Sequence, residues 1–172
     1  LFKKYWGYML AFASAFVVIS ILFYLQGVTP FGDKSLLTID FFHQYGPMLG
    51  ELFDRVKSHL GLLYSFNMSM GLPFYRNFFN YLSSPFNILM LLFSHSELLT
   101  SFSVIVLVKL CFSTLFMYMF LKKKVGLSNV LTVCLSLLYS FSAYFVAYYW
   151  NIMWLDGMVF LPLIVYGLER ML

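Results

Sequence analysis

A short polar segment enclosed by aromatic residues contains the side chains that acid-base chemistry requires. A carboxyl group, an imidazole and an amide follow one another closely in Asp40-Phe-Phe-His43-Gln44. Burial near apolar neighbours raises the pKa of a carboxyl group, which would suit Asp40 to act as a general base. The alternative is structural, with Asp40 capping the following helix and His43 reaching to water. The segment is a candidate active site in which Asp40 is catalytic and His43 and Gln44 bind substrate.

A second candidate acid, Asp156, ends the segment Asn151-Ile-Met-Trp-Leu-Asp156. The topology that the basic residues predict brings it to the same side of the membrane as Asp40. Two carboxylates from separate loops could hold a divalent cation or divide the acid and base roles between them. A solvated acid at the membrane surface is the alternative. The residues establish neither a metal nor any other cofactor.

Lys109 is a third candidate because it stands in the middle of an apolar run. An ionisable side chain at that depth is costly unless it is paired or lies in a polar cavity, so it is a functional candidate by default. It could bind a substrate such as a lipid phosphate, or it could serve only as a structural ion-pair partner. Arg76 belongs to the aromatic, amide-rich stretch 75–81, which could stack on a sugar.

The composition requires a membrane around these candidates. Of the 172 residues, 62% are hydrophobic and only 10% are charged. Soluble domains contain roughly 45–50% apolar and about 25% charged residues, so this chain cannot cover a water-facing surface with polar side chains. A soluble protein is therefore excluded. We expect membrane lipids around the chain and no nucleic acid as a partner.

Four apolar stretches are expected to cross the membrane as α-helices, because a span needs about 20 residues. They cover residues 6–26, 98–121, 128–149 and 152–168. Lysine and arginine concentrate in cytoplasmic loops, so the run Lys122–Lys124 places the link between the second and third spans inside. Lys3 and Lys4 likewise place the N-terminus in the cytoplasm. The prediction is an all-α, multi-pass protein of the cell membrane.

The long loop 27–97 then faces the outside and contains Asp40. Apolar residues recur at three- and four-residue spacing over 47–60, which predicts an amphipathic helix lying in the headgroup layer. The apolar segment 86–93 is too short to span, and it is expected to lie in the interface or to re-enter the membrane. Because the chain starts with Leu1 rather than Met and stops in an apolar stretch, we expect it to be the N-terminal part of a longer protein.

Several motifs, in a fixed order, resemble the start of the YfhO-type bacterial membrane proteins. They are Asp40-Phe-Phe-His-Gln-Tyr-Gly-Pro47, Asn67-Met-Ser-Met-Gly71, Tyr81-Leu-Ser-Ser-Pro-Phe-Asn87, Asn151-Ile-Met-Trp-Leu-Asp156, and finally Leu161-Pro-Leu with Gly167-Leu-Glu-Arg170. The resemblance extends over nearly the whole chain. Such proteins are similar to the GT-C class of membrane glycosyltransferases, so the fold implied is the N-terminal portion of a GT-C-like helical bundle.

The resemblance implies transfer of a sugar from a polyprenyl-phosphate donor to an extracytoplasmic cell-wall glycopolymer such as lipoteichoic acid. By position, Asp40 would be the catalytic base and Asp156 a second outer acid, while Lys109 or Arg76 would receive the phosphate. Family members are several-fold longer, so further site residues would lie beyond Leu172, and we expect the fragment alone to be inactive.

Two alternatives come from other functional classes. A polytopic transporter or lipid flippase would use Lys109 as a coupling or substrate charge within the bilayer. A non-catalytic membrane scaffold would use the outer loop only to dock a partner. The acids of the outer loops favour the enzyme.

Overall fold

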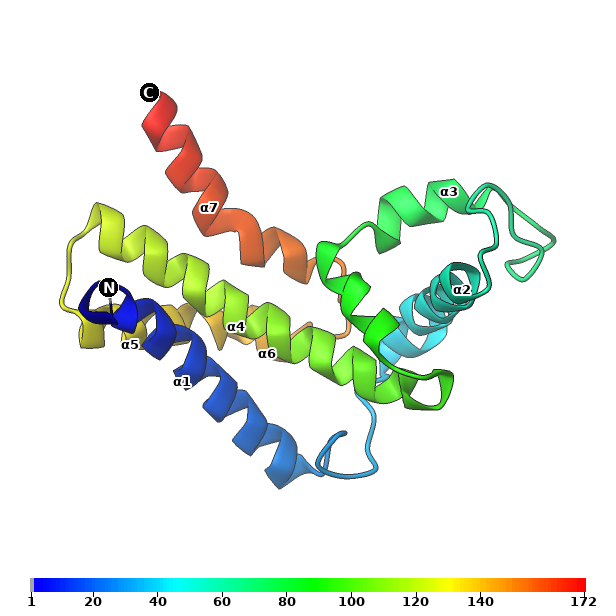
Figure 1. The fold of residues 1–172 in the computed structure, drawn as a ribbon, viewed down its shortest axis with the longest axis horizontal. Coiled ribbons are helices and arrows are strands. Elements are labelled where there is room, and N and C mark those ends of the chain that lie inside the picture. The colour runs from blue at the N-terminus through cyan, green and yellow to red at the C-terminus, as the bar shows by residue number, and fades with distance from the viewer. Residues whose placement is uncertain (1) are drawn as a thin grey trace.

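The computed structural model describes residues 2–172, and the side chains from residue 5 onward. The described residues form an all-helical chain (Figure 1), which confirms the predicted fold class. Its α-helices are α1 (Phe2–Gln26), α2 (Gly46–Lys57), α3 (Phe74–Asn77), α4 (Leu98–Lys124), α5 (Asn129–Ser140), α6 (Ala143–Ala147) and α7 (Leu155–Met171). Two π-helices, η1 (Phe41–Tyr45) and η2 (Phe78–Leu82), and two 3-10 helices, η3 (Pro85–Leu92) and η4 (His95–Glu97), complete it.

Within the described residues, three helical segments are long and apolar enough to cross a membrane. They are Tyr5–Gln26, His95–Lys124 and Asn129–Ala147, which coincide with the first three predicted spans. Helix α7 occupies the position of the fourth predicted span, but it begins at Leu155 rather than at residue 152. The sidedness of the spans stays a prediction.

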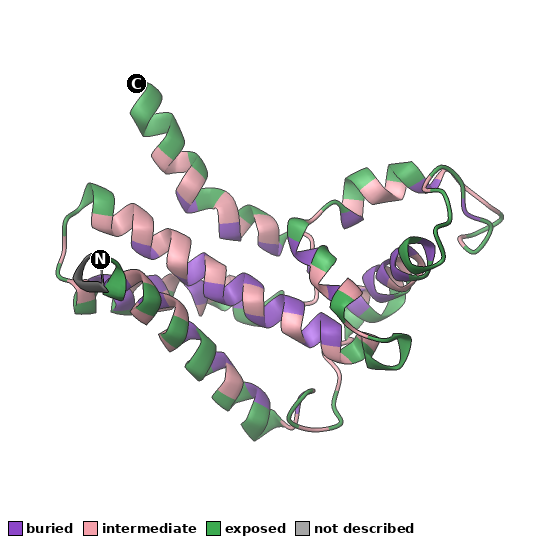
Figure 2. Cartoon of the chain, viewed as in Figure 1, coloured by how far each residue is buried: buried purple, intermediate pink, exposed green. Residues whose placement is uncertain are grey.

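Helix α4 is the centre of the bundle. It packs against α1, α5, α7 and η3, and Figure 2 shows buried residues along much of its length. Small polar side chains allow the backbones of neighbouring helices to approach closely. Such packing matters because the association of helices in a membrane depends on packing rather than on the hydrophobic effect. Buried members of this kind on α4 are Ser101, Ser103, Ser113 and Thr114. Ser140, at the end of α5, donates to Ser113 over 3.1 Å.

Two ion pairs join α7 to α4. Near the start of α7, the Lys109 ammonium lies 2.7 Å from an Asp156 carboxylate oxygen, and near its end Lys124 lies 2.6 Å from Glu169. The first pair is enclosed, whereas the second is partly exposed. Since both pairs follow the chain direction, α7 and α4 run parallel and lie in contact at two levels.

The segment before α4 reaches halfway along that helix. In η3, the ring of Phe86 lies 5.6 Å from Phe112 of α4 and 6.0 Å from Phe160 of α7, measured between ring centroids. Phe112 lies farther along α4 than Lys109, so η3 packs against the middle of the bundle. The depth of residues 86–93 in the membrane stays a prediction.

The predicted amphipathic helix is present as α2, but its apolar face does not lie open to a headgroup layer. Leu49, Leu52 and Phe53 are all buried, and α2 packs against η2 and η3. The helix ends at Lys57 rather than at residue 60, because the chain turns at His59, whose φ is 54°. The first part of the apolar stripe therefore lies in the interior of the loop region, whereas Val56 and Leu60 at its end are exposed.

Candidate functional site

Asp40 stands at the start of the π-helix η1, and its side chain makes no capping hydrogen bond there. Its backbone is already helical, with φ −67° and ψ −23°, whereas a residue that caps through its side chain has extended angles. The preceding residue, Ile39, has a φ of 47°. The capping interpretation of Asp40 is therefore wrong, and the half-buried carboxylate is not used by the helix that follows it.

The Asp40 segment lies side by side with the segment that precedes α7. Thr38 and Tyr149 share a hydrogen bond of 3.0 Å between their hydroxyl oxygens. Tyr45 donates its hydroxyl to the Asn151 side-chain oxygen over 3.1 Å. Two motifs that are far apart in the sequence therefore meet on one face of the bundle.

Tyr45 reports on the electrostatics around Asp40. Burial raises the pKa of the Tyr45 hydroxyl above its ordinary value of 10.0, and the negative charge of Asp40 and the neighbouring Tyr81 raise it further. Tyr45 thus keeps its proton at neutral pH and remains a donor to Asn151.

The predicted substrate contacts His43 and Gln44 both line a polar hollow of about 560 Å³. We call this cavity the polar hollow; its lining also contains Pro47, Met48, Gly50, Glu51, Asp54, Asn67, Met68, Ser69, Leu72 and Asn77. Amides and carboxylates of this kind can hydrogen-bond the hydroxyl groups of a sugar. Arg76 is exposed on α3 and does not belong to this lining.

Glu51 is a residue that the sequence did not single out, yet it organises one wall of the polar hollow. Its carboxylate accepts hydrogen bonds from Arg55, Ser65 and Asn67, each over 2.7 Å. The Arg55 guanidinium also lies 4.8 Å above the ring centroid of Phe74. The spacing of Glu51 and Arg55, four residues apart on a helix, could have indicated the ion pair. Nothing local indicated Ser65 or Asn67.

The surroundings of Glu51 make the wall sensitive to acid. Burial alone would raise the pKa of this carboxyl group, but the hydrogen bonds from Asn67, Ser65 and Arg55, with the Arg55 charge, outweigh it and lower the pKa below its ordinary 4.5. A group whose pKa is lower in the folded state contributes stability above its unfolded pKa and loses it as the pH falls through the folded value.

We therefore expect the loop 58–73 to lose protection from hydrogen exchange, after correction for intrinsic rates, as the pH falls below 4.5. The Glu51→Gln variant should lack this pH-dependent step, because its side chain does not titrate. Protection that stays constant in the unmodified protein over the same range would contradict the assignment.

Gly46 is where the π-helix passes into α2, and a side chain there would collide with the backbone. Its N–H bonds to the carbonyl of Phe41, and a Cβ atom at Gly46 would lie 2.7 Å from that same oxygen and 3.0 Å from a methyl group of Leu37. Gly50, in the same helix, has open space around it. The two glycines therefore form a matched pair.

We expect Gly46→Ala to lower stability by about 1–3 kcal/mol, as overpacking does. We expect Gly50→Ala to raise stability by up to about 1 kcal/mol, because alanine favours helix over glycine. Thermal unfolding of both variants in the same detergent measures the difference. Equal melting temperatures would mean that the turn after Asp40 tolerates a side chain.

Lys109 and Asp156 form an enclosed ion pair between α4 and α7. The Lys109 side chain is 0% exposed and that of Asp156 is 20% exposed. Lys109 also donates to the backbone carbonyl of Ile152 over 2.6 Å, and its ammonium lies 5.7 Å from the ring centroid of Phe86. Structural pairing is thus what the structure shows for Lys109. Asp156 is an ion-paired acid, not a solvated one.

The described residues contain no group of three or more His, Cys, Asp or Glu side chains that could hold a metal ion. Asp156 is already paired with Lys109. The divalent cation between two carboxylates stays a prediction, and we derive no step through it.

Comparison with known proteins relates the chain to a family of bacterial membrane proteins. The model of a family described as "Bacterial membrane protein YfhO" matches residues 11–172. No curated protein and no solved structure matches the chain. The matched range includes the Asp40 segment, the polar hollow and the Lys109–Asp156 pair.

Proposed function

Because the chain belongs to the YfhO family of bacterial membrane proteins, we propose that it takes part in a membrane glycosyltransferase. The reaction moves a sugar from a polyprenyl-phosphate donor to an extracytoplasmic glycopolymer such as lipoteichoic acid. One observation carries this proposal. The carboxylate of Asp40 makes no helix cap, and His43 and Gln44, three and four residues after it, line a polar hollow large enough for a sugar, although Asp40 itself is not part of that lining.

In the proposed reaction, Asp40 removes the proton from an acceptor hydroxyl group. The hydroxyl oxygen forms a bond to the anomeric carbon of the donor as the bond from that carbon to the phosphate oxygen breaks. The bonding electrons leave with the lipid phosphate, and the configuration at the anomeric carbon inverts. This requires the carboxylate within about 3 Å of the hydroxyl group. Positive charge develops on the sugar ring in the transition state, and a nearby carboxylate stabilises it.

The polar hollow supplies contacts for the sugar. His43 and Gln44 offer donors and acceptors from η1, and Asn67 and Asn77 add side-chain amides to the lining. The hydrogen bonds of Glu51 to Ser65 and Asn67 hold the loop 58–73 in place, so the main contribution of Glu51 is to position that loop. Arg76, exposed on α3, remains a candidate contact for the phosphate.

The transporter alternative depended on Lys109 as a charge that a substrate could reach. This side chain is 0% exposed, and both Asp156 and the Ile152 carbonyl engage its ammonium. A coupling role would therefore require the α4–α7 contact to open. No observation in the described part of the chain favours such a movement.

The direct test uses the whole protein, purified into lipid nanodiscs and supplied with a polyprenyl-phosphate sugar and a wall glycopolymer. Transfer of the sugar to the polymer, detected by mass spectrometry, is the expected result. In parallel, cells that lack the gene should lose one glycan modification of an envelope polymer. Normal glycosylation in the deletion strain, together with no transfer in nanodiscs, would reject the proposal.

A further inference from the structure

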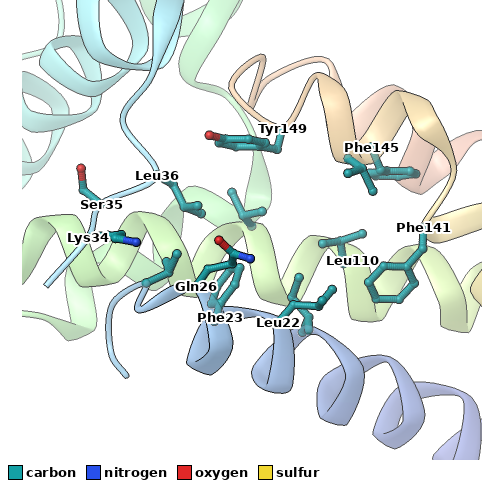
Figure 3. A pocket seen from close by; sticks show the side chains of 14 residues that line it. Leu22, Phe23, Gln26, Lys34, Ser35, Leu36, Leu110, Phe141, Phe145 and Tyr149 are labelled. Atoms are coloured by element: carbon teal, nitrogen blue, oxygen red, sulfur yellow. The ribbon is translucent and has the colours of Figure 1, made fainter. Parts of the chain in front are cut away.

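A second cavity lies on the bundle itself, between α1, α4 and the segment that contains α6. It is an elongated space of about 420 Å³ with mostly apolar walls, and we call it the apolar cleft (Figure 3). Leu22 and Val146, from opposite walls, are 42% and 59% exposed. Both residues lie on segments that are long and apolar enough to cross a membrane, so the apolar cleft is open between two candidate spans.

One end of the apolar cleft is polar. Gln26, Lys34 and Ser35 line it there, and Figure 3 shows the Lys34 ammonium directed toward the space beside Gln26 and Leu36. None of the ion pairs found among the described residues involves Lys34. The apolar cleft therefore combines a hydrocarbon-lined body with an uncompensated cation at its mouth.

The backbone that carries Lys34 is held in place. The N–H of Lys34 bonds to the carbonyl of Gly27 over 3.0 Å, and its carbonyl accepts from the N–H of Thr29 over 2.9 Å. The Thr29 hydroxyl in turn shares a hydrogen bond of 2.8 Å with Ser103 of α4. A tight loop fastened to the central helix thus presents the lysine at a fixed level.

The mouth of the apolar cleft adjoins the candidate active site. Tyr149 lines the apolar cleft, and its hydroxyl group hydrogen-bonds Thr38, two residues before Asp40. A lipid whose chain filled the apolar cleft would therefore place its head group beside the Asp40 segment.

We propose that the apolar cleft holds the isoprenoid chain of the polyprenyl-phosphate donor and that Lys34 binds its phosphate. This inference rests on the proposed function, because it names where that donor sits. The apolar chain of the donor matches the apolar walls, and its anionic phosphate matches the Lys34 cation. In this position the reactive carbon of the donor would face Asp40. A single cleft suits one chain, whereas a phospholipid brings two.

The test measures binding of undecaprenyl phosphate to the whole protein in nanodiscs by native mass spectrometry. Two variants address the apolar cleft: Lys34→Gln removes the cation, and Val146→Trp fills the body. Each has a matched control outside the apolar cleft. Lys123→Gln removes an exposed lysine elsewhere, and Val130→Trp enlarges a valine of α5 that is 63% exposed. Undecaprenol and phosphatidylglycerol serve as competing probes.

We expect Lys34→Gln to weaken binding roughly tenfold, as loss of one charge-assisted contact does. Val146→Trp should weaken it more, and both controls should bind as the unmodified protein does. Undecaprenol lacks the phosphate, so its affinity for the unmodified protein should equal the affinity of undecaprenyl phosphate for Lys34→Gln. Binding that Val146→Trp leaves unchanged would overturn the inference, and so would equal competition by phosphatidylglycerol.

The Asp40→Asn variant separates this inference from the proposed function, because it leaves the apolar cleft intact. If both hold, that variant binds undecaprenyl phosphate normally and transfers no sugar. If it binds the lipid and still transfers sugar, the proposed role of Asp40 fails while the donor seat stands. If transfer depends on Asp40 but not on Lys34 or Val146, the proposed function stands and the donor binds elsewhere on the protein.

Discussion

Replacement of Asp40 by asparagine is expected to abolish sugar transfer by the whole protein while its insertion and abundance stay normal. General bases contribute typically 10²–10⁴-fold to a rate, so a loss of at least about a hundredfold is expected. The substitution keeps the size of the side chain, and Asp40 makes no capping bond that asparagine would lose. Stability should therefore change little, because the removed group is not part of the packing.

The measurement is the mass of envelope polymers in cells that carry Asp40→Asn, beside wild type and a deletion strain. Asp33→Asn is the control, because Asp33 is an exposed acid of the same loop. The substituted strain should lose the same sugar as the deletion strain, and the control should keep it. A sugar that persists in Asp40→Asn would move the transporter or scaffold alternatives ahead of the enzyme.

Loss of one partner of the Lys109–Asp156 pair is expected to be the most destabilising of the changes considered. Breaking a buried pair costs roughly 3–5 kcal/mol, because the remaining charge stays buried without compensation. Lys109→Met leaves Asp156 in that state and also removes the bond to the Ile152 carbonyl. Thermal unfolding in detergent should show a large drop in melting temperature.

The double variant Lys109→Met/Asp156→Leu should recover most of that loss, since it buries no charge. Lys124→Met is the matched control: its pair with Glu169 is partly exposed, and ion pairs at the surface contribute about 0–1 kcal/mol. A double variant as unstable as the single one would show that the charge pair is not the cause.

The same double variant tests the predicted catalytic role of Asp156. If it folds and transfers sugar, Asp156 acts only by positioning the segment that ends at α7. If it folds and Asp40 is intact but transfer is lost, the carboxylate itself is needed. The pH dependence of kcat in the unmodified protein then separates a titrating acid from a positioning residue, because only a titrating Asp156 would account for one limb of the profile.

The predicted spans illustrate what can be foreseen from local pattern. The runs 6–26 and 98–121 are uninterrupted enough to predict α1 and α4, whose ends agree to within a few residues. The span 128–149 is broken at Phe141–Ser142 into α5 and α6. The sequence there is as apolar as elsewhere, so hydropathy gave no indication of the break.

The site needed contacts that no local pattern contains. The residue types identified Asp40, His43 and Gln44, but no local pattern indicated the π-helix that follows Asp40 and carries the other two, or the lack of space for a side chain at Gly46. The pairing of Lys109 with Asp156 joins helices distant in the chain. Apolar periodicity over 47–60 predicted a helix correctly. It could not show whether lipid or protein would cover the apolar face.

The pairing of Lys109 with Asp156 also sets an order for biosynthesis. Lys109 emerges from the ribosome well before Asp156, so α4 meets the insertion machinery with an uncompensated charge. A lysine at the centre of a helix costs about 2.5–3.5 kcal/mol on insertion. Helix α4 is therefore expected to stay beside the translocon, or beside α1, until α7 arrives, and the bundle assembles as a unit rather than helix by helix.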